Sequence, residues 1–539
     1  MLTIKKLNYP SLLWFLFYLV IFSYLIFNSY NYLDADLGWH LDVGKRILEE
    51  RSVPVEEHYD YTLINRTWVD HEWLLNVATY WLYDNYGYFS VSIFFALIVI
   101  LALIVLNIYT RKYFIRGPGG QILIGTIQFF GVLAMAPHLG VRMQTATLLN
   151  LSLLLFIIRT YEITKNTRVL FWLWPLFCFW ANSHAGFLIG VFMLFLWIGI
   201  KSLEIVLKKF RVFARIDFMN ERKSGELVKF LLFALGAVGA TLINPYGLKL
   251  YSFLLDYSNN YYLQVIAEWL PSYSMPIQYK QLIYAALVVA MLTVFTADLA
   301  RSCRKKENST VDGWHLGMIL VLLFMAAQSK RHFPLFFVVS FPWLIFSLVR
   351  DLRLPARFAK YISENTVLKI FVLPIFLLAA ANFLVRAQYA PDPFFSPYFC
   401  GYYPCGAVQY MKNNPDLLDR KILNDYGWGG YMIWTWPGKK LFIDGRLPFY
   451  EFNGHSLLEE YTDFFVAGQA KNKLDKHGIG LVLLKLYPKV SLNWFERKFL
   501  GLDDNEINNQ KRYLRDYLRG AAGWELVYGD KVSEVYAEK

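Results

Sequence analysis

Long apolar runs separated by short polar stretches fill the first 386 residues of the chain. The runs are about 17–22 residues long, the length that a helix needs to cross a hydrocarbon core of about 30 Å. They must be helical, because lipid offers no partner to an unpaired backbone amide or carbonyl group. We therefore predict about eleven membrane-spanning helices, at residues 11–29, 88–110, 121–136, 144–159, 169–182, 185–203, 228–243, 279–298, 314–328, 333–349 and 368–386.

The loops between these runs differ in their content of basic residues. Lys and Arg gather near residues 111–116, 159–168, 208–223, 301–306 and 350–360, and the alternate loops are poor in them. Because cytoplasmic loops carry the excess of Lys and Arg, this pattern puts the N-terminus in the cytoplasm. With an odd number of spans, the C-terminus is expected on the extracytoplasmic side of a plasma (inner) membrane.

From residue 387 onward the hydropathy falls and the periodicity changes. Short apolar runs at 421–423, 440–443 and 481–484 predict strands, and the segments 456–474 and 505–519 have helical patterns. The runs 524–528 and 532–536 flank a turn and predict a terminal hairpin. We expect a polytopic α-helical membrane domain at 1–386, with a long first outer loop at 30–87, and an extracytoplasmic α/β domain at 387–539.

Composition agrees with a membrane protein. The sequence is 56% hydrophobic and 18% charged, whereas soluble domains are nearer one quarter charged. The net charge of +12 comes from the basic loops that set the topology, so it indicates no nucleic-acid partner. No spacing among the four cysteines fits a zinc site. Cys400 and Cys405 either form a disulfide in an oxidising compartment or remain two free thiols.

The first outer loop opens with an Asp-Ala-Asp-Leu-Gly-Trp-His stretch at 34–40. If a helix starts here with Asp34 as its cap, Asp36 and His40 share one face of it. The apolar stripe of this helix, expected in the membrane interface, is Leu37, Leu41 and Leu48. Residues 68–73 open a second amphipathic helix. A loop of this length with its own structure is usually functional.

Further polar residues fall at the outer ends of other spans. Polar groups at membrane depth are costly unless they line a cavity or take part in chemistry. Their convergence from six segments on one face therefore predicts a site. The candidate residues are Asp34, Asp36, His40, Asp70, His71, Glu72, His138, Arg142, His184, Glu268, Arg331 and His332.

Two tasks suit the carboxylates of Asp34 and Asp36. The pair can ligate Mg²⁺ or Mn²⁺, which would screen a phosphate group, or one of them can act as general base toward an acceptor. Arg142 and Arg331 suit a phosphate or pyrophosphate, because the guanidinium group presents two parallel donors.

Each residue also has a plainer interpretation on its own. Asp34 can serve only as a helix cap, and an outer Arg can extend to the lipid headgroups. The tryptophans can be interfacial anchors rather than platforms for sugar rings; these are Trp39, Trp68, Trp73 and Trp269.

Residues 34–44, 68–73, 180–186, 268–269 and 425–446 carry a resemblance to the membrane-embedded GT-C glycosyltransferases. Within that superfamily the chain is most similar to bacterial multi-pass proteins of poorly defined activity. The resemblance implies a sugar donor on a polyprenyl phosphate, entering from the bilayer. It also implies Asp34 or Asp36 as base or metal ligand while an acceptor attacks the anomeric carbon.

The tail also resembles the acceptor-side motif of the oligosaccharyltransferase catalytic subunit. That family has two tryptophans before its Asp-Tyr-Gly, where this chain has Leu423 and Asn424, and this departure argues against peptide N-glycosylation. The glycines here also suit tight turns, and Asp444 with Arg446 also suits a structural ion pair. The resemblance implies acceptor-side roles for Asp425, Tyr426, Trp428, Asp444 and Arg446.

The sequence thus predicts a cell-envelope glycosyltransferase that moves a sugar from a polyprenyl-phosphate donor to a glycan, lipid or protein acceptor on the extracytoplasmic face. A lipid-linked-sugar transporter or flippase is one alternative. It would need polar residues on both faces for alternating access, and the inner loops show no acidic–histidine cluster. A non-catalytic scaffold of the same fold that binds glycan is the other alternative.

Overall fold

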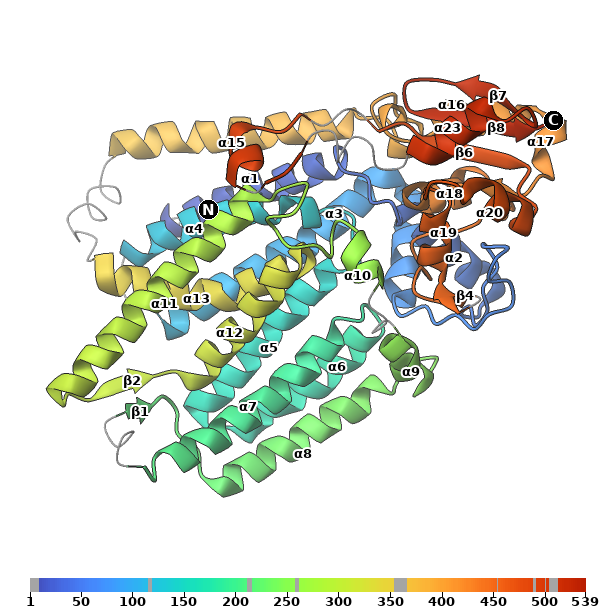
Figure 1. Cartoon of the computed structure of the whole chain (residues 1–539). Helices are drawn as coiled ribbons and strands as arrows, with labels where there is room; N and C mark the ends of the chain where they lie inside the picture. Colours follow the sequence, from blue (N-terminus) through green and yellow to red (C-terminus); the bar gives the residue numbers. More distant parts are fainter. Residues whose placement is uncertain are drawn as a thin grey trace.

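A computed structural model gives the fold of the chain (Figure 1). It describes residues 9–114, 119–210, 216–256, 261–352, 366–452, 454–487, 491–499, 501–503 and 512–539. Parts of three predicted inner loops, at 115–118, 211–215 and 353–365, lie outside these ranges, as does the start of the helix predicted at 505–519.

Each predicted span coincides with a helix. Eight helices of the described residues are long and apolar enough to cross a membrane. They are α1 (Tyr9–Ser29), α3 (Trp73–Tyr113), α4 (Gly119–Met135), α5 (Thr145–Thr164), α7 (Phe187–Leu207), α8 (Ser224–Thr241), α11 (Tyr279–Lys305) and α13 (Phe333–Leu352). Three shorter apolar helices match the remaining spans: η2 (Thr167–Trp172) with α6 (Leu173–Ala181), α12 (Gly313–Gln328) and α15 (Thr366–Gln388). The number of membrane crossings therefore stays a prediction.

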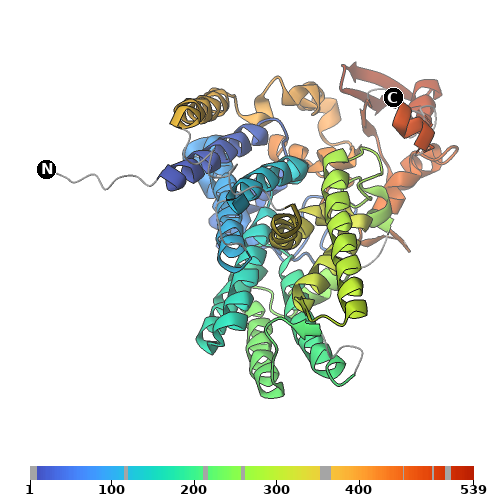
Figure 2. The same ribbon diagram turned by 90° about the vertical axis from the view of Figure 1, so that its left-hand side faces the viewer.

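These helices pack side by side into one bundle. α15 runs along α1 at one edge, while α12 packs against α13, which lies inside the bundle (Figures 1 and 2). Of the candidate spans, the one that contains α13 is the most buried, with 83% of its apolar window inside the protein. A helix that is apolar all round suits such a central position.

One end of the bundle is closed by charged side chains and a short parallel strand pair, β1 (Ile216–Phe218) and β2 (Ser309–Val311). Here Arg159 pairs with Asp312, and with Glu162 at 2.8 Å. Lys201 lies 2.9 Å from Glu204 and 3.7 Å from Glu162. Because all five side chains are buried or nearly so, the pairing compensates their charge. We call this the strand-pair end.

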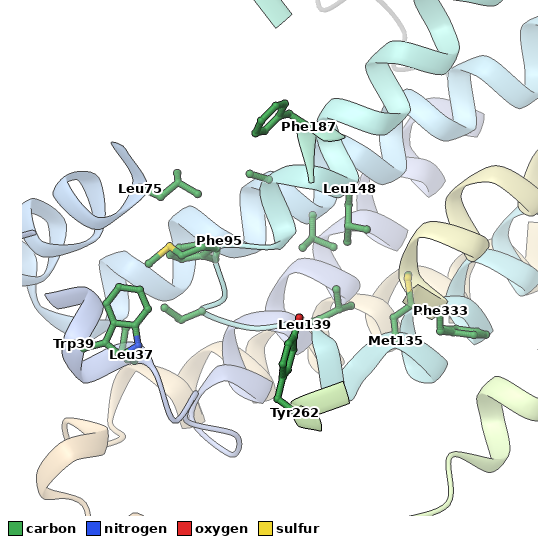
Figure 3. Packing of buried hydrophobic residues seen from close by; sticks show 14 of the residues in the cluster. Leu37, Trp39, Leu75, Phe95, Met135, Leu139, Leu148, Phe187, Tyr262 and Phe333 are labelled. Carbon is green, nitrogen blue, oxygen red and sulfur yellow. The ribbon is translucent and has the colours of Figure 1, made fainter. Parts of the chain in front are cut away.

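The other end carries α2 (Leu37–Glu50), the C-terminal region and two short helices, α9 (Lys249–Asp256) and α10 (Tyr261–Val265) (Figure 1). α2 packs against α3 and under the C-terminal region, with Leu37 and Leu41 buried and Leu48 exposed, and its position in a membrane interface stays a prediction. Its core is continuous with the bundle: Leu37 and Trp39 belong to the same buried cluster as Leu75 and Phe95 (Figure 3). We call this the site end.

The second amphipathic helix predicted at 68–73 is the first part of α3, which starts at Trp73 and reaches Tyr113. The helix kinks at Gly87, whose φ of 74° is unfavourable for other residues. The sequence separated the two parts because only the stretch after the kink is continuously apolar.

The C-terminal region is built on a four-stranded mixed sheet in the order β3-β6-β8-β7. β3 (Ile422–Leu423) pairs in parallel with β6 (Leu481–Lys485), and β8 (Ser533–Glu538) runs antiparallel to both β6 and β7 (Trp524–Gly529). A separate hairpin joins β4 (Glu451–Phe452) to β5 (His455–Ser456). The surrounding helices are α16 (Cys405–Asn413), α17 (Pro415–Leu418), η7 (Tyr426–Trp428), α18 (Gly429–Thr435), α19 (Leu457–Asp463), α20 (Ala470–His477), α21 (Trp494–Phe499) and α23 (Arg512–Gly520).

Two predictions for this region differ from the structure. The run 440–443 is not a strand of the sheet: its Leu441 instead exchanges backbone hydrogen bonds with the first outer loop, donating to Tyr59 and accepting from Tyr61, each at 2.9 Å. The helix predicted at 456–474 is divided into α19 and α20, with Gly468 at a φ of 78° between them. The terminal hairpin is confirmed as β7 and β8.

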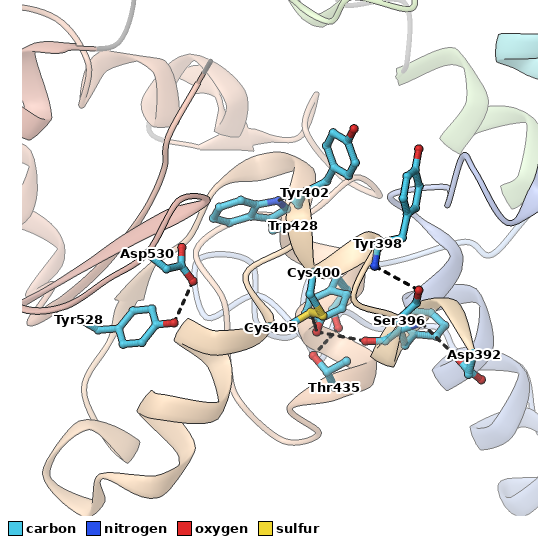
Figure 4. The surroundings of a disulfide bond; sticks show 12 residues. Asp392, Ser396, Tyr398, Cys400, Tyr402, Cys405, Trp428, Thr435, Tyr528 and Asp530 are labelled. Atoms are coloured by element: carbon cyan, nitrogen blue, oxygen red, sulfur yellow. Dashed lines mark hydrogen bonds between the residues drawn. A yellow bond between two sulfur atoms is a disulfide. The ribbon is translucent and has the colours of Figure 1, made fainter. Parts of the chain in front are cut away.

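Cys400 and Cys405 form a disulfide with an S–S distance of 2.08 Å, which selects the first of the two predicted alternatives (Figure 4). It joins η6 (Phe399–Gly401) to the first residue of α16. Tyr431 of α18 donates its hydroxyl hydrogen to the Cys405 sulfur at 3.1 Å. This hydrogen bond connects the start of the C-terminal region to α18, the helix that contacts α2.

Candidate functional site

A cavity of about 520 Å³ lies at the site end, between the bundle, the first outer loop and the C-terminal region. All twelve candidate residues on the predicted outer ends line it, from Asp34 to His332. The predicted convergence of these segments is therefore present in the fold. Whether the cavity faces the extracytoplasmic side stays a prediction.

Arg142 bridges two carboxylates across this cavity. It precedes α5, and its Nε lies 2.7 Å from Asp34 Oδ2 while its Nη1 lies 2.7 Å from Glu268 Oε1. Burial raises the pKa of Glu268, but the positive charges of Arg142 and Arg331 outweigh this effect and lower it to about 2. Glu268 and Arg142 are therefore both charged at neutral pH, and Arg142 joins the first outer loop to the segment after α10.

Asp34 also shapes the start of α2. Its Oδ1 accepts the backbone N–H of Asp36 at 2.9 Å in a short turn before the helix. The N-cap of α2 is Asp36, so Asp34 is not the helix cap that the sequence predicted. This short turn directs the Asp36 carboxylate toward the C-terminal region, where a β-carbon on Gly445 would lie 2.1 Å from Asp36 Oδ1. A side chain at position 445 would therefore displace the Asp36 carboxylate.

The Asp36 carboxyl group has a perturbed pKa. Burial in the cavity wall and the neighbouring Asp34 carboxylate raise it from 3.8 to about 7. A carboxyl group with a pKa near neutrality is a better general base than an ordinary aspartate, because it holds a proton more tightly after accepting it. Of the two aspartates, Asp36 is thus the one suited to proton transfer, while Asp34 is held by Arg142.

Three histidines surround Glu72 deeper in the cavity wall. Their Nε2 atoms lie near its carboxyl oxygens, at 3.6 Å for His184, 3.8 Å for His71 and 3.9 Å for His40. Burial and the neighbouring Asp70 raise the pKa of Glu72 well above its usual value. Burial lowers the pKa of His40 to about 3, and burial with Arg331 lowers that of His71 to about 4. Burial thus disfavours the charged form of Glu72 and of the histidines around it.

Hydrogen bonds behind this group orient its imidazoles. Asn76 donates to Asp70 Oδ2 at 2.9 Å, and its own Oδ1 lies 2.7 Å from His40 Nδ1. The backbone N–H of Gly186 donates to His184 Nδ1 at 2.9 Å, which leaves the His184 proton on Nε2, toward Glu72. Asn76 was missed by the sequence argument, because it is a polar residue within the first turn of a long apolar helix.

Arg331 presents the more accessible cation of the cavity. It lies in η4 (Lys330–His332), its guanidinium stacks 4.9 Å over Trp269, and its contact with Glu268 is long at 3.8 Å. Its neighbour Lys330 is buried instead and donates to the carbonyl groups of Ala267 and Met275. Of these two basic residues, only Arg331 lines the cavity.

Arg446 enters the cavity wall from the C-terminal region. It pairs with Asp444 and lies 2.7 Å from Glu57 Oε2, and its guanidinium stacks between Tyr59 at 4.4 Å and Trp68 at 4.6 Å. Glu57 was not among the predicted residues, since nothing in the sequence marks a charged loop residue as buried. This ion pair fastens the first outer loop to the C-terminal region.

The acceptor-side residues divide into two groups. Tyr426 and Arg446 line the cavity, whereas Asp425, Trp428 and Asp444 do not. Asp425 accepts the Gly427 N–H at 3.0 Å and so caps η7, and the indole of Trp428 donates to a backbone carbonyl. These three side chains shape the tail rather than face the cavity.

Tight backbone contacts explain the glycines of this motif. A β-carbon on Gly430 of α18 would lie 2.2 Å from the Ala35 carbonyl oxygen, and one on Gly38 of α2 would lie 1.9 Å from the Gly430 carbonyl oxygen. The motif therefore provides the surface on which the start of α2 rests.

Apolar side chains form an apolar wall as part of the lining of the same cavity. It includes Leu148, Leu188, Ile189, Leu254, Ile266 and Leu335. Trp39, Trp68 and Trp269 also line the cavity. The cavity can therefore hold a molecule that is apolar at one end and anionic or polar at the other.

The residues present do not fit a divalent cation in this arrangement. The Asp34 carboxylate already forms an ion pair with Arg142, and the Asp36 carboxylate lies against the Gly445 backbone. Within the described ranges, no group of three or more His, Cys, Asp or Glu side chains is placed to hold a metal ion. The Mg²⁺ or Mn²⁺ ion stays a prediction, and no chemical step below depends on one.

Comparison with known proteins supports the fold. No family model matches the sequence, and no curated protein matches it. A solved structure that matches is the archaeal oligosaccharyltransferase AglB from Archaeoglobus fulgidus, in complex with an inhibitory peptide and a dolichol-phosphate. The match covers 99% of this chain and 74% of that chain, with a TM-score of 0.52 and 13% identity. At this identity the likeness shows the fold alone, and that fold is the GT-C fold that the sequence resemblance implied.

Proposed function

We propose that the protein is a membrane glycosyltransferase that moves a sugar from a polyprenyl-phosphate-linked donor to an acceptor at the site end. One observation carries the proposal: a single cavity combines an apolar wall with a carboxyl group of raised pKa and an accessible guanidinium. A lipid-linked sugar has matching parts, namely an isoprenoid chain, a phosphate and a sugar whose acceptor must lose a proton.

The proposed donor lies with its isoprenoid chain along Leu188, Ile189 and Leu335. Its phosphate is placed at Arg331, because Arg142 is already engaged by two carboxylates. The guanidinium of Arg331, which stacks over Trp269, can donate N–H groups to an anion. Two parallel hydrogen bonds to a phosphate are the favoured geometry of such a contact.

In the proposed transfer step, Asp36 accepts the proton of an acceptor O–H or N–H group as that atom attacks the anomeric carbon. The new bond forms to the anomeric carbon while its bond to the phosphate oxygen breaks. The polyprenyl phosphate leaves with the electron pair, and Arg331 stabilises its charge. Asp36 ends the step protonated, which its raised pKa favours.

A turnover assay tests this function. Purified protein in lipid nanodiscs is given polyprenyl-phosphate and polyprenyl-diphosphate sugars, each with hydroxyl- or amide-bearing acceptors, and release of the lipid phosphate is measured. We expect turnover of at least one donor in the wild-type protein and its loss in Asp36→Asn. The matched control is Asp298→Asn, an exposed aspartate near the strand-pair end of α11, which should turn over donor normally.

The two alternatives predict other results. A non-catalytic scaffold would bind donor and leave it intact in every combination, with the same result for Asp36→Asn. A transporter or flippase would move labelled donor across a vesicle membrane without cleaving it. The strand-pair end offers this alternative little support, because its buried acidic residues are paired with Arg159 and Lys201.

A further inference from the structure

Arg142 occupies the position between two acidic residues where a cation would be expected. The side chain is 20% exposed and contacts Asp34 through Nε and Glu268 through Nη1, both at 2.7 Å. Asp36 adds a third carboxyl group to the same cavity wall. Neighbouring carboxylates repel one another when ionised, and the positive charge of Arg142 offsets this repulsion.

The protein backbone holds Arg142 in this place. Its carbonyl group accepts the N–H of Thr145 at 3.0 Å and the Thr145 hydroxyl at 2.8 Å, at the start of α5. A positive charge at a helix N-terminus is unfavourable by itself, because the helix dipole is positive there. The two carboxylates offset this cost, so the three charges depend on one another.

A divalent cation and this guanidinium compete for the same oxygen atoms. A metal ion bound to Asp34 and Glu268 would lie beside Arg142 and be repelled by it, unless Arg142 moved away. The guanidinium provides one positive charge and five N–H donors in a fixed plane. It can therefore hold the carboxylates in place and still direct an N–H group into the cavity.

We propose that Arg142 is a built-in cation that takes the place of a divalent metal ion: it fixes Asp34 and Glu268 in place and adds positive charge to the cavity in which the phosphate leaves at Arg331, so that transfer needs no metal. The part that concerns the phosphate rests on the proposed function. The part that concerns cation binding does not, and it is measured separately. Arg142 is in this sense a positioning residue for Asp34 and, through the Asp34 turn, for Asp36.

The first test measures Mn²⁺ binding without any donor, by the loss of the free Mn²⁺ signal in electron paramagnetic resonance. We expect no binding to the wild-type protein at micromolar Mn²⁺. Arg142→Met should gain a site, and Arg142→Met with Glu268→Gln should lose it again. Arg301→Met, which removes an exposed arginine near the strand-pair end, should behave as wild type. Tight Mn²⁺ binding to the wild-type protein that disappears in Asp34→Asn would overturn the proposal.

The second test follows donor turnover in the presence of EDTA. The wild-type rate should be unchanged, and Arg142→Ala should lose about 100-fold or more, as removal of a single preorganised charge does in other enzymes. Added guanidinium ions at millimolar concentration should restore part of the Arg142→Ala rate, and they should not affect Arg301→Ala. Rescue distinguishes a missing cation from a misfolded variant, because a small ion does not refold a protein. Abolition of wild-type turnover by EDTA contradicts metal independence.

The two tests separate the inference from the proposed function. If no donor is cleaved but Mn²⁺ binding appears only in Arg142→Met, the result supports Arg142 as a built-in cation and contradicts the glycosyltransferase assignment. If donor is cleaved and Mn²⁺ binds the wild-type protein at Asp34, the function stands and the inference fails.

Discussion

The carboxylate of Asp36 rests directly on the backbone of Gly445, and a β-carbon at position 445 would lie 2.1 Å from its Oδ1 atom. Gly445→Ala should therefore displace Asp36 and lower donor turnover by about tenfold or more, since small misplacements of reacting groups have such effects. Gly523→Ala is the matched control, because a β-carbon there meets no atom within 4 Å. Equal turnover in the two variants would show that the position of Asp36 does not matter for the reaction.

The pKa of Asp36, raised to about 7, predicts the pH dependence of the reaction. A general base must be deprotonated to act, so kcat/KM should rise with pH and level off above about pH 7. Asp34→Asn should move this rise to lower pH, because the Asp34 carboxylate helps to raise the pKa of Asp36. A profile that is flat between pH 5 and pH 8 would exclude Asp36 as the base.

Removal of Arg331 should affect donor binding more than the fold. Its contact with Glu268 is long, at 3.8 Å, and a partly exposed ion pair of this kind contributes about 0–1 kcal/mol. Arg331→Gln should therefore unfold at nearly the wild-type temperature but show a raised KM for the donor, and Arg331→Lys should show a smaller rise. Saturation kinetics with the lipid donor test this, and an unchanged KM would place the phosphate elsewhere.

Arg446 should matter for stability. Its removal in Arg446→Met leaves Glu57 and Asp444 buried without their shared partner, a change that costs about 3–5 kcal/mol in other proteins. Protease protection of residues 387–539 should fall. The triple variant that adds Glu57→Gln and Asp444→Asn should recover most of it, because no unpaired charge is then buried. Full protection of Arg446→Met would mean that the ion pair does not fasten the loop.

The cysteines can report which side of the membrane the cavity faces. The disulfide Cys400–Cys405 lies at the site end and exposed Cys303 lies near the strand-pair end of α11. In intact cells, a membrane-impermeant maleimide should label Cys400 and Cys405 once an impermeant reductant has opened their disulfide. The same reagent should label Cys303 only after the cells are opened. Labelling of Cys303 alone in intact cells would reverse the proposed orientation.

The sequence predicted the helices and most of the cavity for one reason. Apolar runs of membrane-spanning length have few possible structures, and a polar residue such as His138 or His332 is conspicuous beside them. The argument needs no knowledge of which helices touch. It succeeds wherever the cost of a polar group at membrane depth is high.

Prediction from the sequence failed where the role of a residue depends on its contacts in space. Arg142 and Arg331 look alike in the sequence, yet one is held by two carboxylates and the other is accessible. Trp428 looks like a binding residue and is buried in the tail. Nothing in the local pattern reveals that Gly445 lies against Asp36, because the two residues are about 400 positions apart in the chain.

That separation has a consequence for biogenesis. The ribosome completes the segment with Asp36 early, and the Gly445 turn on which it rests is made only when most of the chain has been synthesised. Contacts between such distant segments form late, since the intervening chain must be ordered first. A prematurely terminated chain can insert its helices but lacks one wall of the cavity, so newly made protein acquires a complete site only near the end of its synthesis.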